Sequence, residues 1–298
     1  MNRPSPKTSR YSISLSGLWR RYFGRISLTM LLVAIESGLG VLYPLAIGIA
    51  IDDLLKESFE GLIQLGILGL ASTVIGSVRR FYDTRIYARI YEGVATELVE
   101  REHASGANIS RISARVNLLT EFVEFFEQSM PELIGAIVSL IGILLIVAGL
   151  SLPVLFACVA LLVLVVIIYT VTAARNYRLN GGYNDELEGA VSAISSKNAD
   201  RTAGHFQRLM RWNIRLSDLE TWNYLVFWLG AVALFMYAPF EAVQAGVLEV
   251  GLILSLLLYV FEFINWLAEL PIHIQQFIRL KEIADRLQAS DSENEEPT

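Results

Sequence analysis

The side chains of this sequence that could do chemistry are acidic and amide groups inside two long apolar segments. Glu36 lies about ten residues into the segment 26–51, and Glu262 lies midway along the segment 247–271. An acid at membrane depth costs roughly 2–3 kcal/mol or more, so it usually faces a cavity or a partner. From Glu262 onward, polar residues recur every three or four positions and so share one helix face: Glu262, Asn265, Glu269, His273 and Gln276.

We expect Glu36, Glu262, Asn265 and Glu269 to line a water-filled cavity. The acidic character of such a cavity suits a cationic or amphiphilic ligand. The alternative is that these side chains hydrogen-bond to neighbouring helices. For the residues at the end of the polar face, a further alternative is simple exposure near the inner membrane interface.

No catalytic or metal-binding pattern accompanies these acids. His103, His205 and His273 are far apart, with no H-E-x-x-H motif, and Cys158 is the single cysteine. A G-x-x-x-x-G-K-[ST] loop occurs nowhere in the sequence, so nothing here would cradle ATP phosphates. We therefore expect no catalytic residue, no metal and no cofactor in this chain, and no enzyme activity of its own. A nucleic-acid partner is not expected either, and the net charge of −6 is no evidence for a basic partner.

The elements that position these residues are membrane-spanning helices. Of the 298 residues, 54% are hydrophobic, and mean hydropathy is +0.48. Several apolar runs reach the roughly 20 residues that a helix needs to cross the bilayer, where backbone groups must pair within their own segment. We predict an all-α integral membrane protein with six spans: Ile26–Ile51, Leu62–Val78, Leu133–Leu150, Pro153–Ala173, Tyr224–Tyr237 and Val247–Pro271.

Lysine and arginine predict the orientation of these spans. Of the 24 cations, 23 fall before the first span, in the second and fourth connections, or after the sixth span, and only Lys56 lies in the other loops. The positive-inside rule therefore puts both termini in the cytosol. The sequence has no secretory signal pattern, because its basic N-terminal stretch leads into a full-length span.

The two inner connections, about 79–130 and 174–221, are predicted to be long helical hairpins. In the first, Ile86, Ile90, Val94 and Leu98 form an apolar face of helical period. The second is expected to break at Gly181-Gly182 and to turn at Lys197-Asn198.

Shorter elements complete this plan. We expect an interfacial helix within 1–25, outer loops at 52–61, 151–152 and 239–246, a kink near Pro131, and a disordered acidic tail over 289–298.

This arrangement resembles the transmembrane domain of ATP-binding-cassette exporters over residues 15–288. Gly106, Ser110 and Arg111 match that family's G-x-x-x-S-R-[IL] stretch, and Leu42–Asp53 looks like the end of its first helix. Glu188-Gly189 followed by Phe206 matches the spacing of the second hairpin. Tyr259 and the run to Ala284-Asp-Arg-Leu match the sixth helix and its exit.

The sequence also departs from that family. The exporters continue into a nucleotide-binding domain, whereas this sequence ends eleven residues after Leu287. Arg115 stands where the first hairpin tip usually carries an acid. Residues 193–199 read A-I-S-S-K-N-A where the second tip usually carries V-K-x-F-x-x-E.

The resemblance implies the membrane-spanning subunit of an exporter-type transporter in the bacterial inner (plasma) membrane, whose homodimer forms the translocation pathway. A separate ATPase polypeptide would then dock on 107–116 and 194–198 and hydrolyse ATP, so that ATP acts only through this partner. The coupling-loop candidates are Arg111, Arg115, Lys197 and Asn198. The alternative, which the departures favour, is a motor-less channel, regulator or scaffold that kept the exporter fold.

Overall fold

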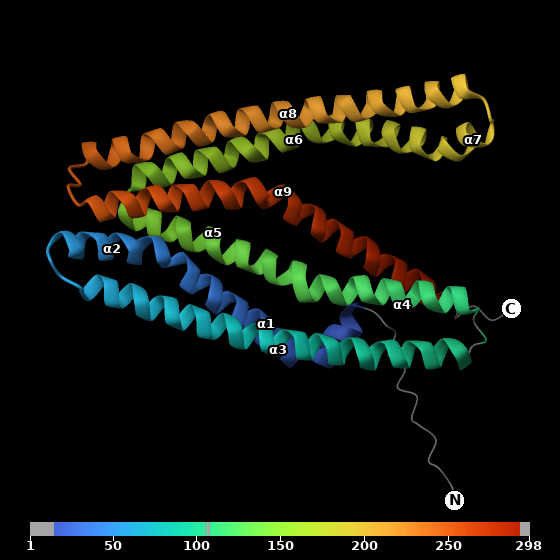
Figure 1. Ribbon diagram of the computed structural model, residues 1–298, viewed down its shortest axis with the longest axis horizontal. Helices are drawn as coiled ribbons and strands as arrows, with labels where there is room; N and C mark the ends of the chain where they lie inside the picture. The colour runs from blue at the N-terminus through green and yellow to red at the C-terminus, as the bar shows by residue number, and fades with distance from the viewer. Residues whose placement is uncertain (1–14, 105, 107, 293–298) are drawn as a thin grey trace, which may run out of the picture. The chain divides into compact units, whose positions relative to one another are not determined.

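The computed structural model describes residues 15–104, 106 and 108–292, and all regular structure in these ranges is helical (Figure 1). Side chains are described between residues 21 and 276, apart from those of 105, 107, 122, 273 and 274. The elements in chain order are α1 (Leu15–Val41), α2 (Tyr43–Leu55), α3 (Glu60–Ala104), α4 (Ile109–Glu124), the π-helix η1 (Phe125–Ser129), α5 (Met130–Leu150), α6 (Leu152–Glu188), α7 (Ala190–Ser195), α8 (Ala199–Gln244) and α9 (Val250–Ser292).

Six helical stretches within the described ranges are long and apolar enough to cross a membrane: Arg21–Leu55, Glu60–Ala104, Ile109–Leu150, Leu152–Ser195, Ala199–Gln244 and Val250–Ile272. Each contains one predicted span, or nearly all of it, which confirms the six-span all-α prediction. The most apolar window of the second stretch has only 11% of its residues buried. Apolar side chains exposed in this way suit contact with lipid rather than with water.

The chain divides into two compact units. Unit 1 comprises residues 1–145, 249–255 and 265–298, and unit 2 comprises residues 146–248 and 256–264. Helix α9 therefore contributes its two end regions to unit 1 and its middle to unit 2.

In unit 1, α3 and α4 are the two arms of the first hairpin (Figure 1). The four predicted face residues of α3 are all buried, in one cluster with Leu119 and Phe126. Their 3.6-residue spacing puts them on one side of the helix, and this prediction is confirmed. Glu102 on α3 and Arg115 on α4 form a buried ion pair between the arms, with side chains 1% and 5% exposed. Hydrophobic packing and this internal charge pair thus hold the two arms of the hairpin together.

In unit 2, α6 and α8 form the second hairpin, and α7 lies between them in the chain. The predicted break at Gly181-Gly182 is wrong, because α6 runs unbroken from Leu152 to Glu188. Gly182 instead gives room to the other arm: a Cβ on it would lie 2.8 Å from ring atoms of Trp212. The turn does fall at Lys197-Asn198, where Lys197 has φ 51° and Asn198 caps α8 by accepting from the Arg201 N–H.

Several helix ends differ from the sequence prediction. Helix α1 is continuous from Leu15, so the expected interfacial helix is the first part of α1 and not a separate element. The break falls within the predicted first span, where α2 begins at Tyr43, just before Pro44. Asp52 and Asp53, expected in the first outer loop, belong to α2.

Two further differences concern prolines and the tail. Helix α8 continues through Pro239 to Gln244, and α9 continues through Pro271. A proline removes one hydrogen bond but does not end a helix that packing supports. Residues 289–292, predicted as part of the disordered tail, belong to α9, while 1–14 and 293–298 lie outside the described residues.

Candidate functional site

A cavity of about 910 Å³ lies in unit 1, between side chains from α1, α3, η1, α5 and α9. Its size falls in the range of roughly 300–1,000 Å³ that is usual for small-molecule sites. The lining residues are Val33, Glu36 and Ser37 of α1; Arg79, Arg80, Asp83 and Thr84 of α3; Glu127 and Gln128 of η1; Pro131, Glu132 and Gly135 of α5; and Trp266, Glu269, Ile272 and Gln276 of α9.

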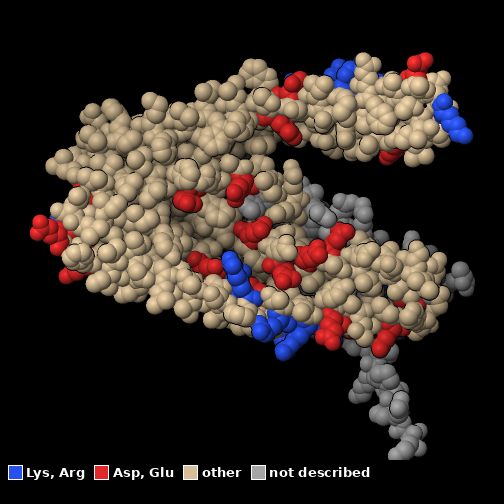
Figure 2. All heavy atoms as spheres, in the orientation of Figure 1, with Lys and Arg blue, Asp and Glu red and all other residues tan. Residues whose placement is uncertain are grey.

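The lining carries a net negative charge. Five carboxylates and two arginines line it, which gives a formal charge of −3. In Figure 2, acidic side chains on unit 1 gather around a smaller basic group. An excess of one sign of charge in a cleft raises the local concentration of ions of the opposite sign, so the net charge of this lining favours cations.

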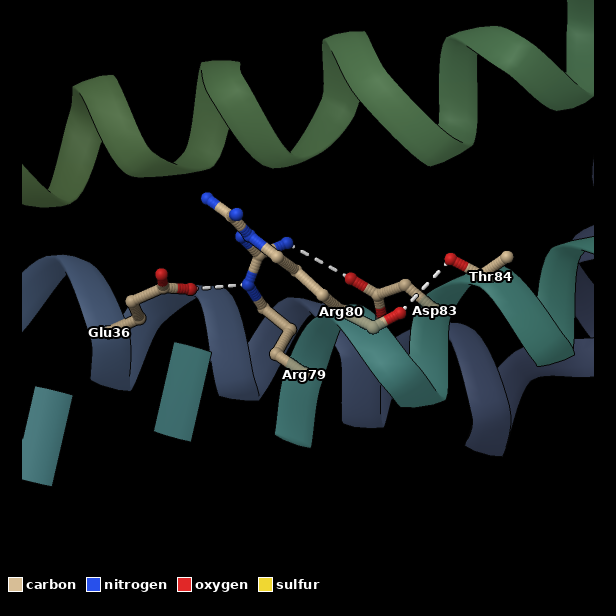
Figure 3. A network of polar contacts seen from close by, with 5 residues as sticks. All are labelled: Glu36, Arg79, Arg80, Asp83 and Thr84. Atoms are coloured by element: carbon tan, nitrogen blue, oxygen red, sulfur yellow. Dashed lines mark hydrogen bonds and ion pairs between the residues drawn. The ribbon is translucent and has the colours of Figure 1, made fainter. Parts of the chain in front are cut away.

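Arg79 is the centre of a polar network in this cavity (Figure 3). Its Nε donates to Glu36 of α1, and its Nη1 donates to Asp83 Oδ2 at 3.0 Å, one turn further along α3. The side chains of Arg79, Glu36 and Asp83 are 18%, 29% and 7% exposed. The network therefore ties α1 to α3 with charges that are largely removed from solvent.

Gly76, one turn before Arg79, provides the space for this contact. A Cβ on Gly76 would lie 2.7 Å from Glu36 Oε1, closer than real Cβ contacts allow. The small residue in α3 thus lets the carboxylate of α1 approach the helix and reach the arginine.

Asp83 keeps an unused acceptor. While its Oδ2 accepts from Arg79, its Oδ1 is buried and has no hydrogen-bond partner within the described residues. Buried polar atoms without a partner are rare and costly. Glu127, another lining residue, lies within electrostatic reach of Asp83.

The π-helix η1 sets the direction of two further acids. The Met130 N–H donates to the Phe125 carbonyl, an i→i+5 bond that takes one residue more per turn than an α-helix. In an uninterrupted α-helix, Glu127 and Glu132 would point about 140° apart. The wide turn instead allows both to line the same cavity.

Helix α9 supplies the aromatic and amide part of the wall. Trp266, Glu269, Ile272 and Gln276 follow one another at intervals of three or four residues and so share one face. The Gln276 amide donates to Glu132 Oε2 at 3.4 Å. This face gives the cavity one aromatic ring among its carboxylates.

The structure brings together two of the four predicted cavity residues. Glu36 and Glu269 both line the cavity, whereas Asn265 is half-buried and does not. Glu262 is exposed and is not among the lining residues either. The side chain of His273 lies outside the described residues.

Sequence reasoning missed the other charged lining residues, which are Arg79, Arg80, Asp83, Glu127 and Glu132. The spacing of Arg79 and Asp83, opposite charges four residues apart at the end of a span, was a usable signal. The spacing of Glu127 and Glu132 gave no such signal, because the two acids are five residues apart and face the same way through the π-helix.

The coupling-loop candidates lie in different settings. Arg111 is exposed near the start of α4, and Lys197 and Asn198 are exposed at the tip of the second hairpin. Arg115, in contrast, is 4% exposed and forms an ion pair with Glu102. Its guanidinium therefore holds the first hairpin together rather than facing a docking partner.

A comparison with protein families matches residues 16–247 to the ABC transporter transmembrane region. The chain belongs to this family. As an ABC transporter transmembrane region, it is the membrane part of an ABC-type transporter, and it crosses the membrane several times. A comparison with curated proteins finds no match. The match to the ABC transmembrane region includes α1 to α8, which carry all lining residues of the cavity except those of α9.

Proposed function

We propose that this chain and a second copy form the translocation pathway of an exporter-type ABC transporter in the bacterial inner membrane, with both termini in the cytosol. A nucleotide-binding ATPase outside these 298 residues drives it, while the chain itself holds no cofactor and has no enzyme activity. The cavity of unit 1 is the place where cargo binds. The observation that carries this proposal is a cavity of about 910 Å³ lined by seven charged residues in an ABC transmembrane region.

Exposed apolar side chains at the hairpin tips are evidence for the docking of an ATPase. Ile109, at the start of α4, is 81% exposed, and Val191 and Ile194, both in α7, are 78% and 60% exposed. All three lie in the connections that the positive-inside rule assigns to the cytosol. Large apolar side chains gain free energy when a partner removes them from water, so these positions suit a protein contact.

Copurification from native membranes tests this proposal. The affinity-tagged full chain is solubilised in mild detergent, and ATP hydrolysis in the eluate is measured while mass spectrometry identifies the copurifying chain. We expect an ATPase with the wild type and its loss with Ile109→Asp or Ile194→Asp. The matched control is Leu248→Asp, because Leu248 is 92% exposed but lies in the outer connection before α9.

Two results overturn the proposal. One is that no ATPase copurifies with the wild type in repeated preparations. The other is that Leu248→Asp removes the ATPase as completely as the two hairpin substitutions, since the hairpin tips would then not be the docking site.

A second candidate function is a channel, regulator or scaffold without a motor. The observation that favours it is the closed tip of the second hairpin, where the Ala193 carbonyl accepts from Ser196 Oγ at 2.7 Å and from Thr202 Oγ1 at 3.1 Å. A tip that satisfies its own polar groups offers fewer of them to a partner. Reconstitution of the chain alone in liposomes separates the two functions: flux without ATP that is lost in Glu127→Gln supports the second.

A further inference from the structure

We propose that the cavity of unit 1 binds an organic cation, whose N–H donors lie between Glu127 and Glu132 and whose apolar body lies against Trp266. This inference rests on the proposed function only in treating the cavity as the place of cargo binding. It adds the chemical class of the cargo, and the chain alone is sufficient to test it.

The first support is the balance of charge after internal pairing. Arg79 already neutralises part of the charge of Glu36 and Asp83, and the remaining lining acids are Glu127, Glu132 and Glu269. Arg80 is the second lining arginine. The lining keeps a formal charge of −3 with both arginines counted, so a cation completes the site electrostatically.

The second support is that one arginine serves two acids. The Arg79 guanidinium pairs with both Glu36 and Asp83, so these three side chains keep one negative charge. The carboxylates of Glu127 and Glu132 line the same cavity, and a carboxylate oxygen can only accept hydrogen bonds. An ammonium or guanidinium group supplies those hydrogens together with positive charge.

The third support is the aromatic side chain of α9. Trp266 lines the cavity one turn before Glu269 on the same helix face. An indole ring attracts a cation to its face and packs against apolar groups, which an inorganic ion does not use. The described residues also contain no group of histidine, cysteine and acidic side chains that could hold a metal ion. Together these observations favour an organic cation over a metal.

Equilibrium dialysis with three matched probes tests the proposal on the full chain in lipid nanodiscs. The probes are 1-naphthylmethylammonium, 1-naphthylmethanol and 1-naphthoate, which share one ring and differ in charge. We expect the ammonium to bind at least about tenfold more tightly than the alcohol, because hydrogen bonds to charged groups are the stronger ones, and the naphthoate not to bind. Affinity for the ammonium should also fall as salt is raised.

Conservative variants locate the site. Glu127→Gln and Glu132→Gln each keep the side-chain shape and remove one charge, and each should weaken ammonium binding about tenfold while leaving alcohol binding unchanged. Unchanged alcohol binding and an unchanged unfolding midpoint show that a variant is folded. The matched control is Glu92→Gln, because Glu92 is an exposed acid of α3 outside the cavity lining and should have no effect.

Equal affinity for the ammonium and the alcohol overturns the proposal, since binding would then depend on the ring alone. Charge-selective binding that neither Glu127→Gln nor Glu132→Gln weakens overturns it as well, because the cation would then bind elsewhere. These outcomes are independent of the ATPase experiment. A chain that binds the ammonium but captures no ATPase refutes the proposed function and leaves this inference standing.

Discussion

Replacing Arg79 by methionine should destabilise the protein by about 3 kcal/mol. The change keeps an apolar stem of similar length but leaves Glu36 and Asp83, which both accept from this guanidinium, without their cation. Removing one partner of a buried ion pair costs about 3–5 kcal/mol, mostly because the remaining charge is buried and unpaired. We take the lower end, because Glu36 is 29% exposed and both acids border a cavity that admits water.

A double-mutant cycle separates the pair from the rest of the site. Glu36→Gln keeps an acceptor for Arg79 and removes one charge, so it should cost only about 1 kcal/mol. The loss in the Arg79→Met/Glu36→Gln double variant should be smaller than the sum of the single losses, because the second change removes one of the acids that the first leaves unpaired. Residues in direct contact typically couple by about 0.5–3 kcal/mol.

Unfolding in mixed SDS–detergent micelles, followed by circular dichroism, measures these free energies. Arg80→Met is the matched control, because it makes the same chemical change one residue further along α3, where the side chain is exposed. A loss below about 0.5 kcal/mol for Arg79→Met, or an equal loss for Arg80→Met, would refute the reasoning that the network holds α1 against α3.

Four further predictions concern the hairpins and the orientation of the chain in the membrane. Gly181→Ala should stabilise the second hairpin by about 0.5–1 kcal/mol in thermal unfolding, since its Cβ meets nothing within 4 Å. Gly182→Ala should lose that gain or destabilise by about 1–3 kcal/mol, because its Cβ would overlap the indole ring of the opposite arm. Arg115→Met should destabilise the first hairpin by about 3–5 kcal/mol, because the buried Glu102 carboxylate loses this cation. A loss no larger than that of Arg111→Met, at the exposed arginine of α4, would contradict this. In spheroplasts of a cysteine-free variant, an impermeant maleimide should label Leu248→Cys but leave Lys197→Cys unlabelled until the membrane is opened, and the reverse pattern would invert the proposed orientation.

The sequence predicted the spans and hairpins well because bilayer thickness and helical period act locally. An apolar run of about 20 residues predicts a span whatever surrounds it in the sequence. The buried face of α3 can be predicted from a 3.6-residue repeat alone, in Ile86, Ile90, Val94 and Leu98. The errors fell on glycine and proline. Gly182 and Pro239 both suggest a helix end, but packing against Trp212 explains the glycine, and α8 continues through the proline.

The candidate site was harder to predict, since its residues come from five elements. Glu36 and Glu269 were recognisable as acids within apolar helices, and both line the cavity. The polar face of α9 was assigned too widely, because helical spacing alone does not show which part of a face borders a cavity. Arg115 shows the opposite problem: its position in the sequence suggested a tip, while its burial against Glu102 depends on how two arms pack.

The π-helix before α5 has a consequence for the length of the chain at this point. The five residues of its i→i+5 turn cover about the rotation that four residues cover in an α-helix, so the turn absorbs one residue and keeps the faces before and after it aligned. A relative that lacks one residue between Glu127 and Glu132 can therefore form an ordinary α-helix in which the two acids are about 40° apart, still on one face. Removing one residue from α5 after Glu132, where no wide turn absorbs the change, would instead turn these acids by about 100° relative to the rest of the span. Function here therefore depends on where a residue is lost as well as on residue types.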